Sequence, residues 1–138
     1  MSFYKGEEIF LGKQLLGELY SCNHVALNNP EDVKVLMEEA AVKANATIVQ
    51  SVFHHFSPHG VSGVVVIQES HFAIHTWPEH NFVSVDFYTC GSTAFPEKAM
   101  DYLVEVLQPA SYDLKEVNRG DLHKIEEIAD HTANKSLK

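Results

Sequence analysis

The chain has 138 residues, of which 45% are hydrophobic and 21% charged, and its formal net charge is −9. This composition predicts a globular domain with a real core and excludes a disordered or fibrous chain. Nucleic-acid binding requires clustered positive charge, whereas the ten lysines and arginines are scattered, so we expect no nucleic-acid partner.

The apolar runs, the N-terminal sequence and the cysteines indicate the cellular compartment of the protein. The longest apolar stretch, Val64 to Ile67, is far shorter than the roughly 20 residues of a membrane helix. Residues 1–10 lack the basic-then-apolar order of a signal peptide. The two cysteines, Cys22 and Cys90, could form at most one disulfide. We therefore expect a cytoplasmic protein with free thiols and no membrane partner.

Hydrophobic periodicity predicts a mixed fold. Stretches rich in β-branched and aromatic residues are predicted as strands: Gln14–Cys22, Thr47–Phe56, Val61–Glu69, His71–Trp77, Phe82–Cys90 and Tyr112–Val117. Apolar residues at helical spacing predict helices over Pro30–Lys43 and Pro96–Leu107. From Gly120 the chain is polar and is expected to be loose. The result is one α+β domain over 1–138, a two-layer sandwich of a largely antiparallel sheet with two helices on one face.

Strand alternation then predicts which side chains share a face. In the strand from His71, the side chains of His75 and Trp77 lie opposite Phe72 and Ile74, and Cys90 lies opposite the apolar set of its own strand. If both apolar sets face the helices, His75, Trp77 and Cys90 can converge on the far side. That far side is the candidate site.

Two familiar chemistries fit the pattern poorly. His71 and His75 are four residues apart, which in a strand is about 13 Å, too far for both to ligate one ion at about 2 Å. We therefore predict no metal site. A nucleophilic hydrolase lacks its usual signature, because there is no G-x-S-x-G elbow around Ser62 or Ser70. Taken singly, each of these polar residues could also be an ordinary structural residue.

The stretch VSGVVVIQESHFAIHTWPEH, residues 61–80, contains the least expected feature. A buried strand has little use for Glu69-Ser70-His71 directly after an apolar run. These motifs together resemble the short prokaryotic form of S-adenosylmethionine decarboxylase, and the residues that carry the resemblance are Phe53 to Ile67, Glu69-Ser70-His71, Ile74 to His80 and Tyr88-Thr89-Cys90-Gly91. The resemblance runs from about Gly12 to Gly120 and includes Glu18-Leu19-Tyr20 and Cys22.

The resemblance implies a proenzyme that cuts itself between Glu69 and Ser70. The Ser70 hydroxyl would attack the preceding carbonyl, and the resulting ester would be resolved to leave a β chain, 1–69, and an α chain, 70–138, that begins with a covalent pyruvoyl group. This cofactor would form a Schiff base with the substrate amine and accept the electrons left when CO2 departs. By the family pattern His75 and Ser62 assist processing, and Cys90 returns a proton to the decarboxylated carbon.

For the substrate, the resemblance implies that Phe56 and Trp77 sandwich adenine, that Glu79 binds the ribose hydroxyls and that Glu18 also lies in the site. It further implies a homodimer of processed protomers, and a product that serves as the aminopropyl donor for spermidine synthesis.

The chain departs from the family pattern at two places in its first strand region. Gly12-Lys13-Gln14 stands where Gly-Arg-His is usual, and Asn23 stands where an Asp usually follows the cysteine. Two alternatives stay open: a pyruvoyl-dependent decarboxylase of ornithine or arginine, and an unprocessed, non-catalytic homologue.

Overall fold

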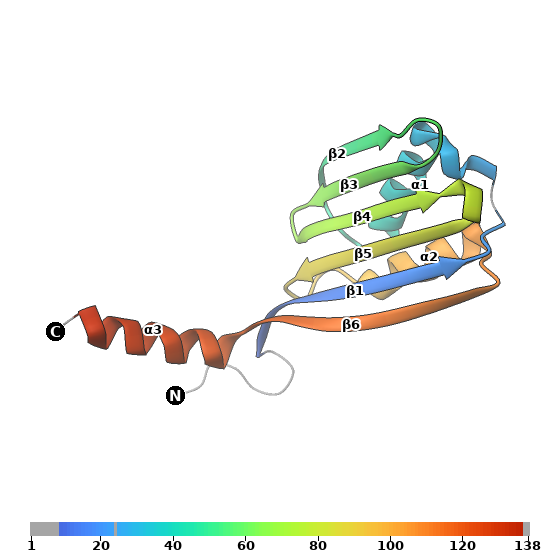
Figure 1. The fold of residues 1–138 in the computed structure, drawn as a ribbon. Helices are drawn as coiled ribbons and strands as arrows, with labels where there is room; N and C mark the ends of the chain where they lie inside the picture. Colours follow the sequence, from blue (N-terminus) through green and yellow to red (C-terminus); the bar gives the residue numbers. More distant parts are fainter. Residues whose placement is uncertain (1–8, 24, 137–138) are drawn as a thin grey trace.

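A computed structural model of the chain describes residues 9–23 and 25–136. Its centre is a six-stranded antiparallel sheet in the order β2-β3-β4-β5-β1-β6 (Figure 1). The strands are β1 (Phe10–Tyr20), β2 (Ile48–His55), β3 (Val61–Ile67), β4 (Ser70–Trp77), β5 (Phe82–Cys90) and β6 (Ser111–Asp121). The helices are α1 (Pro30–Lys43), α2 (Pro96–Leu107) and α3 (Leu122–Ser136), with 3-10 turns η1 (Val25–Asn28) and η2 (Pro78–His80).

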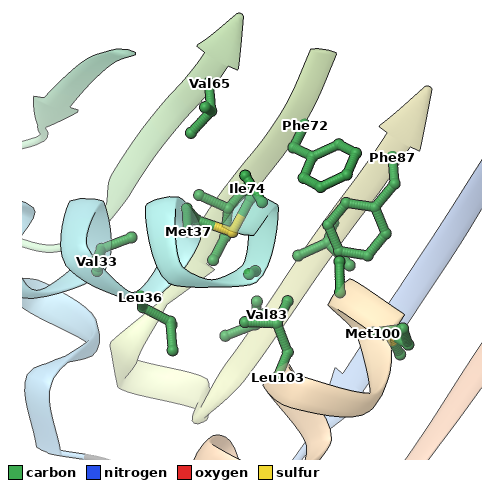
Figure 2. Close-up of a cluster of buried hydrophobic side chains, with 14 of the residues drawn as sticks. Val33, Leu36, Met37, Val65, Phe72, Ile74, Val83, Phe87, Met100 and Leu103 are labelled. Atoms are coloured by element: carbon green, nitrogen blue, oxygen red, sulfur yellow. The ribbon is translucent and has the colours of Figure 1, made fainter. Parts of the chain in front are cut away.

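The core lies between one face of the sheet and two helices. Helix α1 packs against β2, β3 and β4, and α2 packs against β1 and β5 (Figure 1). Alternate residues of β4 and β5 point into this layer, where the rings of Phe72 and Phe87 meet edge to face with centroids 4.7 Å apart (Figure 2). Burying each such side chain is worth about 1.5–3 kcal/mol. The predicted two-layer α+β sandwich is therefore confirmed.

Both predicted helices are present with the predicted bounds, because their N-terminal signals are strong. Each helix begins at a proline, whose missing N–H costs nothing in a first turn. The side chain of Asn29 caps α1 by accepting hydrogen bonds from the backbone N–H groups of Glu31, at 2.9 Å, and Asp32, at 3.3 Å. The helices thus fix which sheet face is covered.

The sequence prediction was wrong at several element ends. Strand β1 begins at Phe10 and ends at Tyr20, so Cys22 lies beyond it, and β6 continues to Asp121. Glu69 lies in the two-residue turn between β3 and β4 rather than in the strand. A turn can place a carboxylate outside the apolar layer. Glu69 therefore does not conflict with the buried apolar run that precedes it.

The predicted loose C-terminus was also wrong, since the chain forms α3. Asp121 accepts a hydrogen bond from the backbone N–H of Lys124 at 3.1 Å, which is a helix-capping contact. Leu122, Ile125 and Ile128 recur at helical spacing, although Ile125 and Ile128 stay exposed. Helix α3 points away from the sheet beyond β6 (Figure 1).

The expectation about a signal peptide falls largely on residues 1–8, outside the described part of the chain. Over the described residues, no helix combines the length and hydropathy that crossing a membrane requires.

One buried hydroxyl ties the end of β4 to its neighbours, and its removal should destabilise the fold. The Thr76 hydroxyl accepts a hydrogen bond from the Val61 N–H at 2.9 Å and donates one to the Leu27 carbonyl at 2.7 Å. Thr76→Val leaves both partners unsatisfied, so we expect the free energy of unfolding in urea to fall by about 1–3 kcal/mol. Thr93→Val, at an exposed threonine, is the control. Equal stability of the two variants would contradict this assignment.

Candidate active site

The sheet face opposite the helices carries the candidate residues. Along β4 and β5 the side chains of Phe72, Ile74, Val85 and Phe87 are buried, while those of the alternate residues are half-buried or exposed, apart from the small Ala73. Within the described chain no helix covers this open face. The predicted alternation is thus confirmed, and His75, Trp77 and Cys90 share the open face.

A histidine and a serine meet at the end of the sheet where β4 finishes. The Ser62 hydroxyl and His75 Nδ1 are 2.8 Å apart, because Ser62 and His75 are direct partners in the β3–β4 pairing. His75 also pairs across β5 with Ser84, which in turn pairs with Glu18 of β1. Ser62, His75, Ser84 and Glu18 therefore form one row across four strands.

Aromatic side chains border this row. The rings of Trp77 and Phe82 are 5.4 Å apart between centroids, and Tyr20 continues the stack at 5.2 Å from Phe82. Phe56 lies just beyond β2, where its ring meets His54 edge to face at 4.6 Å. Trp77 is 41% and Phe56 47% exposed, so both leave ring surface accessible. Glu79 is exposed in the adjoining turn η2.

The predicted scissile bond lies at the opposite end of β4. The Glu69 carbonyl accepts a hydrogen bond from the backbone N–H of Cys90 at 2.8 Å, and the Glu69 carboxylate accepts one from the Thr47 N–H at 3.1 Å. Ser70 has φ 145°, in a region that side-chain-bearing residues rarely adopt. The bond that precedes Ser70 is therefore held at its carbonyl, and the backbone that follows is strained.

Distance along the strands separates the scissile bond from the His75 row within one chain. Ser70 pairs with Thr89 and His75 pairs with Ser84, so five residues of extended strand, about 16 Å, separate Ser70 from His75. Cys90 lies six residues from Ser84 along β5, about 20 Å. Within one protomer His75 and Trp77 do lie together, with ring centroids 6.3 Å apart, but Cys90 does not join them, since alternation fixes the face and not the position along the strand.

Sequence reasoning passed over two residues beside the predicted scissile bond. Thr47 contributes only its backbone N–H, which no side-chain pattern could reveal. Asp86 accepts one hydrogen bond from Gln14 at 3.1 Å and contacts His71 Nε2 at 2.8 Å. Alternation along FVSVDFYTC does put Asp86 on the same face as Cys90, so the pattern contained a usable signal. Across the described residues, no group of three or more His, Cys, Asp or Glu is arranged to hold a metal ion.

Comparison with known proteins identifies the family. A family model described as S-adenosylmethionine decarboxylase matches residues 13–120. A curated S-adenosylmethionine decarboxylase proenzyme from Thermodesulfovibrio yellowstonii is 45% identical over 128 residues, covering 92% of this chain and 95% of the relative. One from Caldicellulosiruptor saccharolyticus is 47% identical over 110 residues, covering 80% and 89%.

A solved structure agrees with the sequence matches. The crystal structure of adenosylmethionine decarboxylase from Aquifex aeolicus superposes with a TM-score of 0.75 at 40% identity, over 80% of this chain and 92% of that one. The chain therefore belongs to the S-adenosylmethionine decarboxylase family, as the motifs around Glu69-Ser70 predicted. Helix α3 lies beyond the residues that the family model matches.

The two cysteines differ sharply in their surroundings, which predicts different reactivity. Cys90 is exposed, whereas Cys22 is 4% exposed and burial raises the pKa of its thiol to about 11. At pH 8 the Cys22 thiol therefore stays protonated. We expect iodoacetamide to label Cys90 in the folded protein and Cys22 only after denaturation, as read by peptide mass mapping. Cys90→Ser should take up no label while folded, and rapid labelling of native Cys22 would contradict the burial of this thiol.

Proposed function

We propose that this chain is a self-processing S-adenosylmethionine decarboxylase that makes the aminopropyl donor for spermidine synthesis. The single observation that carries the proposal is the Glu69–Ser70 bond, held at its carbonyl by Cys90 and placed at the tip of a hairpin, in a chain of this family. The names of the relatives favour S-adenosylmethionine over ornithine or arginine as substrate, and the presence of the processing residues Ser70 and His75 and of the proton donor Cys90 argues against a non-catalytic homologue.

Self-cleavage can proceed with this chain's own residues. The Ser70 hydroxyl attacks the Glu69 carbonyl carbon, and collapse breaks the C–N bond, which leaves an ester and a free amine on residue 70. The Cys90 N–H, already bonded to that carbonyl oxygen, stabilises the negative charge that develops there; loss of one such donor costs roughly 100- to 1,000-fold in rate. Loss of the residue-70 α-proton then expels the new C-terminal α-carboxylate of Glu69 and leaves dehydroalanine at position 70. Its imine tautomer reacts with water to give the pyruvoyl ketone and ammonia.

The products would be chain 1–69 and chain 70–138 of a single domain, the second beginning with a pyruvoyl group. Residues around Ser70 fit that group, since the hairpin turn exposes the new ends and the exposed Cys90 thiol is next to Thr89, the partner of Ser70. When present, the pyruvoyl ketone supplies an electron sink for the carbanion that decarboxylation leaves. Cys90 Sγ then donates a proton to the substrate carbon that has lost its carboxylate.

The position of His75 argues for a second copy of the chain. His75 must take the α-proton from residue 70, yet the two lie about 16 Å apart in one protomer. A twofold axis that crosses the strands near Ala73 would lay a second open face on the first, with the two β4 strands antiparallel. Because Ala73 lies about midway between Ser70 and His75, the partner's His75 would then lie level with the Ser70 end of β4.

The open face has the surface that such packing requires. Val52, Val64 and Val66 are 38–59% exposed on it, and Ala73 leaves room at its centre. Two sheets stacked face to face lie about 10 Å apart, a gap that side chains from both can fill. We therefore propose a homodimer with two composite sites, each taking Glu69, Ser70 and Cys90 from one protomer and Ser62 and His75 from its partner.

The aromatic end of the sheet fits the substrate. Phe56 and Trp77 present exposed rings that can stack on adenine and face a sulfonium cation. The carboxylates of Glu79 and Glu18 can accept hydrogen bonds from ribose hydroxyls or attract the cationic substrate. We also propose a cytoplasmic location, where spermidine precursors are made.

Replacement of Ser70 tests the proposed function most simply. We expect intact-mass measurement of the purified wild-type protein to give two fragments, residues 1–69 and residues 70–138 with a ketone in place of the terminal amine. Ser70→Ala lacks the attacking hydroxyl, so it should stay a single chain of full mass and release no CO2 from S-adenosylmethionine.

Cys90→Ala is the matched variant, because it keeps the backbone N–H that holds the Glu69 carbonyl but loses the thiol. It should still be cut while turnover falls by roughly 100-fold or more. An uncut wild-type protein, or a cut Ser70→Ala protein, would refute the proposed function.

A further inference from the structure

A chain of polar side chains crosses the open face and ends beside the predicted cleavage site. Arg119 of β6 donates a hydrogen bond to the side-chain carbonyl of Gln14 on β1. The Gln14 amide donates to Asp86 of β5 at 3.1 Å, and Asp86 Oδ1 lies 2.8 Å from His71 Nε2 on β4. These four residues, which we term the cross-strand network, join four neighbouring strands.

The outer end of this network is held by packing. The Arg119 guanidinium lies over the Tyr88 ring, 5.2 Å from its centroid, and the same ring lies 5.7 Å from His71. A Cβ at Gly12 would come within 2.6 Å of the Tyr88 ring, so the missing side chain of Gly12 is what lets the ring occupy this position. Arg119 and His71 are therefore braced against one ring as well as through hydrogen bonds.

The cross-strand network ends at His71, the residue that follows the strained Ser70. Ser70 holds φ 145°, a conformation that persists only when the neighbouring structure enforces it. On one side Glu69 is fixed by the Cys90 and Thr47 N–H groups. On the other side the adjoining residue, His71, has a half-buried side chain fixed by Asp86. Both residues that flank the strained Ser70 are thus held by hydrogen bonds.

We propose that Asp86 and His71, supported by Gln14 and Arg119, are positioning residues for self-cleavage. They act by holding the Ser70 backbone so that its hydroxyl stays in line with the Glu69 carbonyl carbon. This inference rests on the proposed function. The effective contacts are hydrogen bonds to Asp86 Oδ1, which Gln14 donates to directly and His71 donates to through Nε2–H.

The test is the rate at which freshly made full-length chain is converted to two fragments, followed by intact mass. Asp86→Ala should slow cleavage by roughly tenfold or more, since small misplacements of reacting groups cost up to about 100-fold. Asp86→Asn keeps an oxygen where Oδ1 stands and should restore a rate close to that of the wild type. The melting temperatures of the two variants are the control. If both variants melt at the same temperature, a general loss of stability cannot explain why Asp86→Asn restores the rate and Asp86→Ala does not.

A double substitution separates a linked pair from two independent residues. If His71 and Asp86 act as one unit, His71→Ala combined with Asp86→Ala should be no slower than the slower single variant. Asp101→Ala, at an exposed aspartate of α2, is the control and should be cut at the wild-type rate.

If Asp86→Ala does not fold, Gln14→Ala serves instead, because it removes only one donor to Asp86 and should also slow cleavage.

The outcomes distinguish failure of the proposed function from failure of the positioning role. A wild-type chain that is never cut refutes the proposed function itself. A wild-type chain that is cut, with Asp86→Ala or the substitute Gln14→Ala cut equally fast, overturns only the positioning role. Asp86→Asn as slow as Asp86→Ala would also overturn it, since charge rather than hydrogen-bond geometry would then be what matters.

Discussion

The length of strand β4 is the constraint on which the site depends. Extended backbone advances about 3.3 Å per residue, so Ser70 and His75 lie at opposite ends of one rigid, fully paired strand. No side-chain rotation can close about 16 Å. The same ladder that makes the sheet stable therefore divides the candidate catalytic residues into two groups, and the proposed composite site between two copies would bring them together.

A second physical feature is the contrast between the two ends of that strand. At Trp77 the open face is aromatic and bordered by carboxylates, which suits a cationic nucleoside. At Ser70 the chain is strained and its preceding carbonyl is already hydrogen-bonded to Cys90. The residues proposed to bind substrate and those proposed to make and break bonds thus lie at separate ends of each protomer, so each proposed composite site would combine one end from each copy.

Much of the fold could be predicted from the sequence because its signals are local. Proline at the first helical position and alternating apolar residues fixed both core helices and the buried face of β4 and β5. The C-terminal helix was missed because its exposed apolar residues are few and polar residues surround them. The turn at Glu69 was missed because an apolar run does not show where its strand ends.

The sequence predicted which sheet face His75 and Cys90 share, but not their arrangement along the strands. Alternation placed His75 and Cys90 on one face, which the burial of their neighbours bears out. It could not give their separation, since that depends on the pairing Ser70↔Thr89 and His75↔Ser84. The hydrogen bonds from Thr47 and Asp86 join residues far apart in the chain, and only the folded structure brings them together.

The composite site is tested most directly by mixing two inactive chains. Ser70→Ala and His75→Ala should each stay uncut alone, one for lack of the nucleophile and the other for lack of the base. When they are co-expressed with different tags and the mixed dimer is purified, the His75→Ala chain should be cut at Glu69–Ser70, because its partner supplies the missing histidine. Mixed dimers in which neither chain is cut, or a His75→Ala chain that is cut alone at the wild-type rate, would contradict the account.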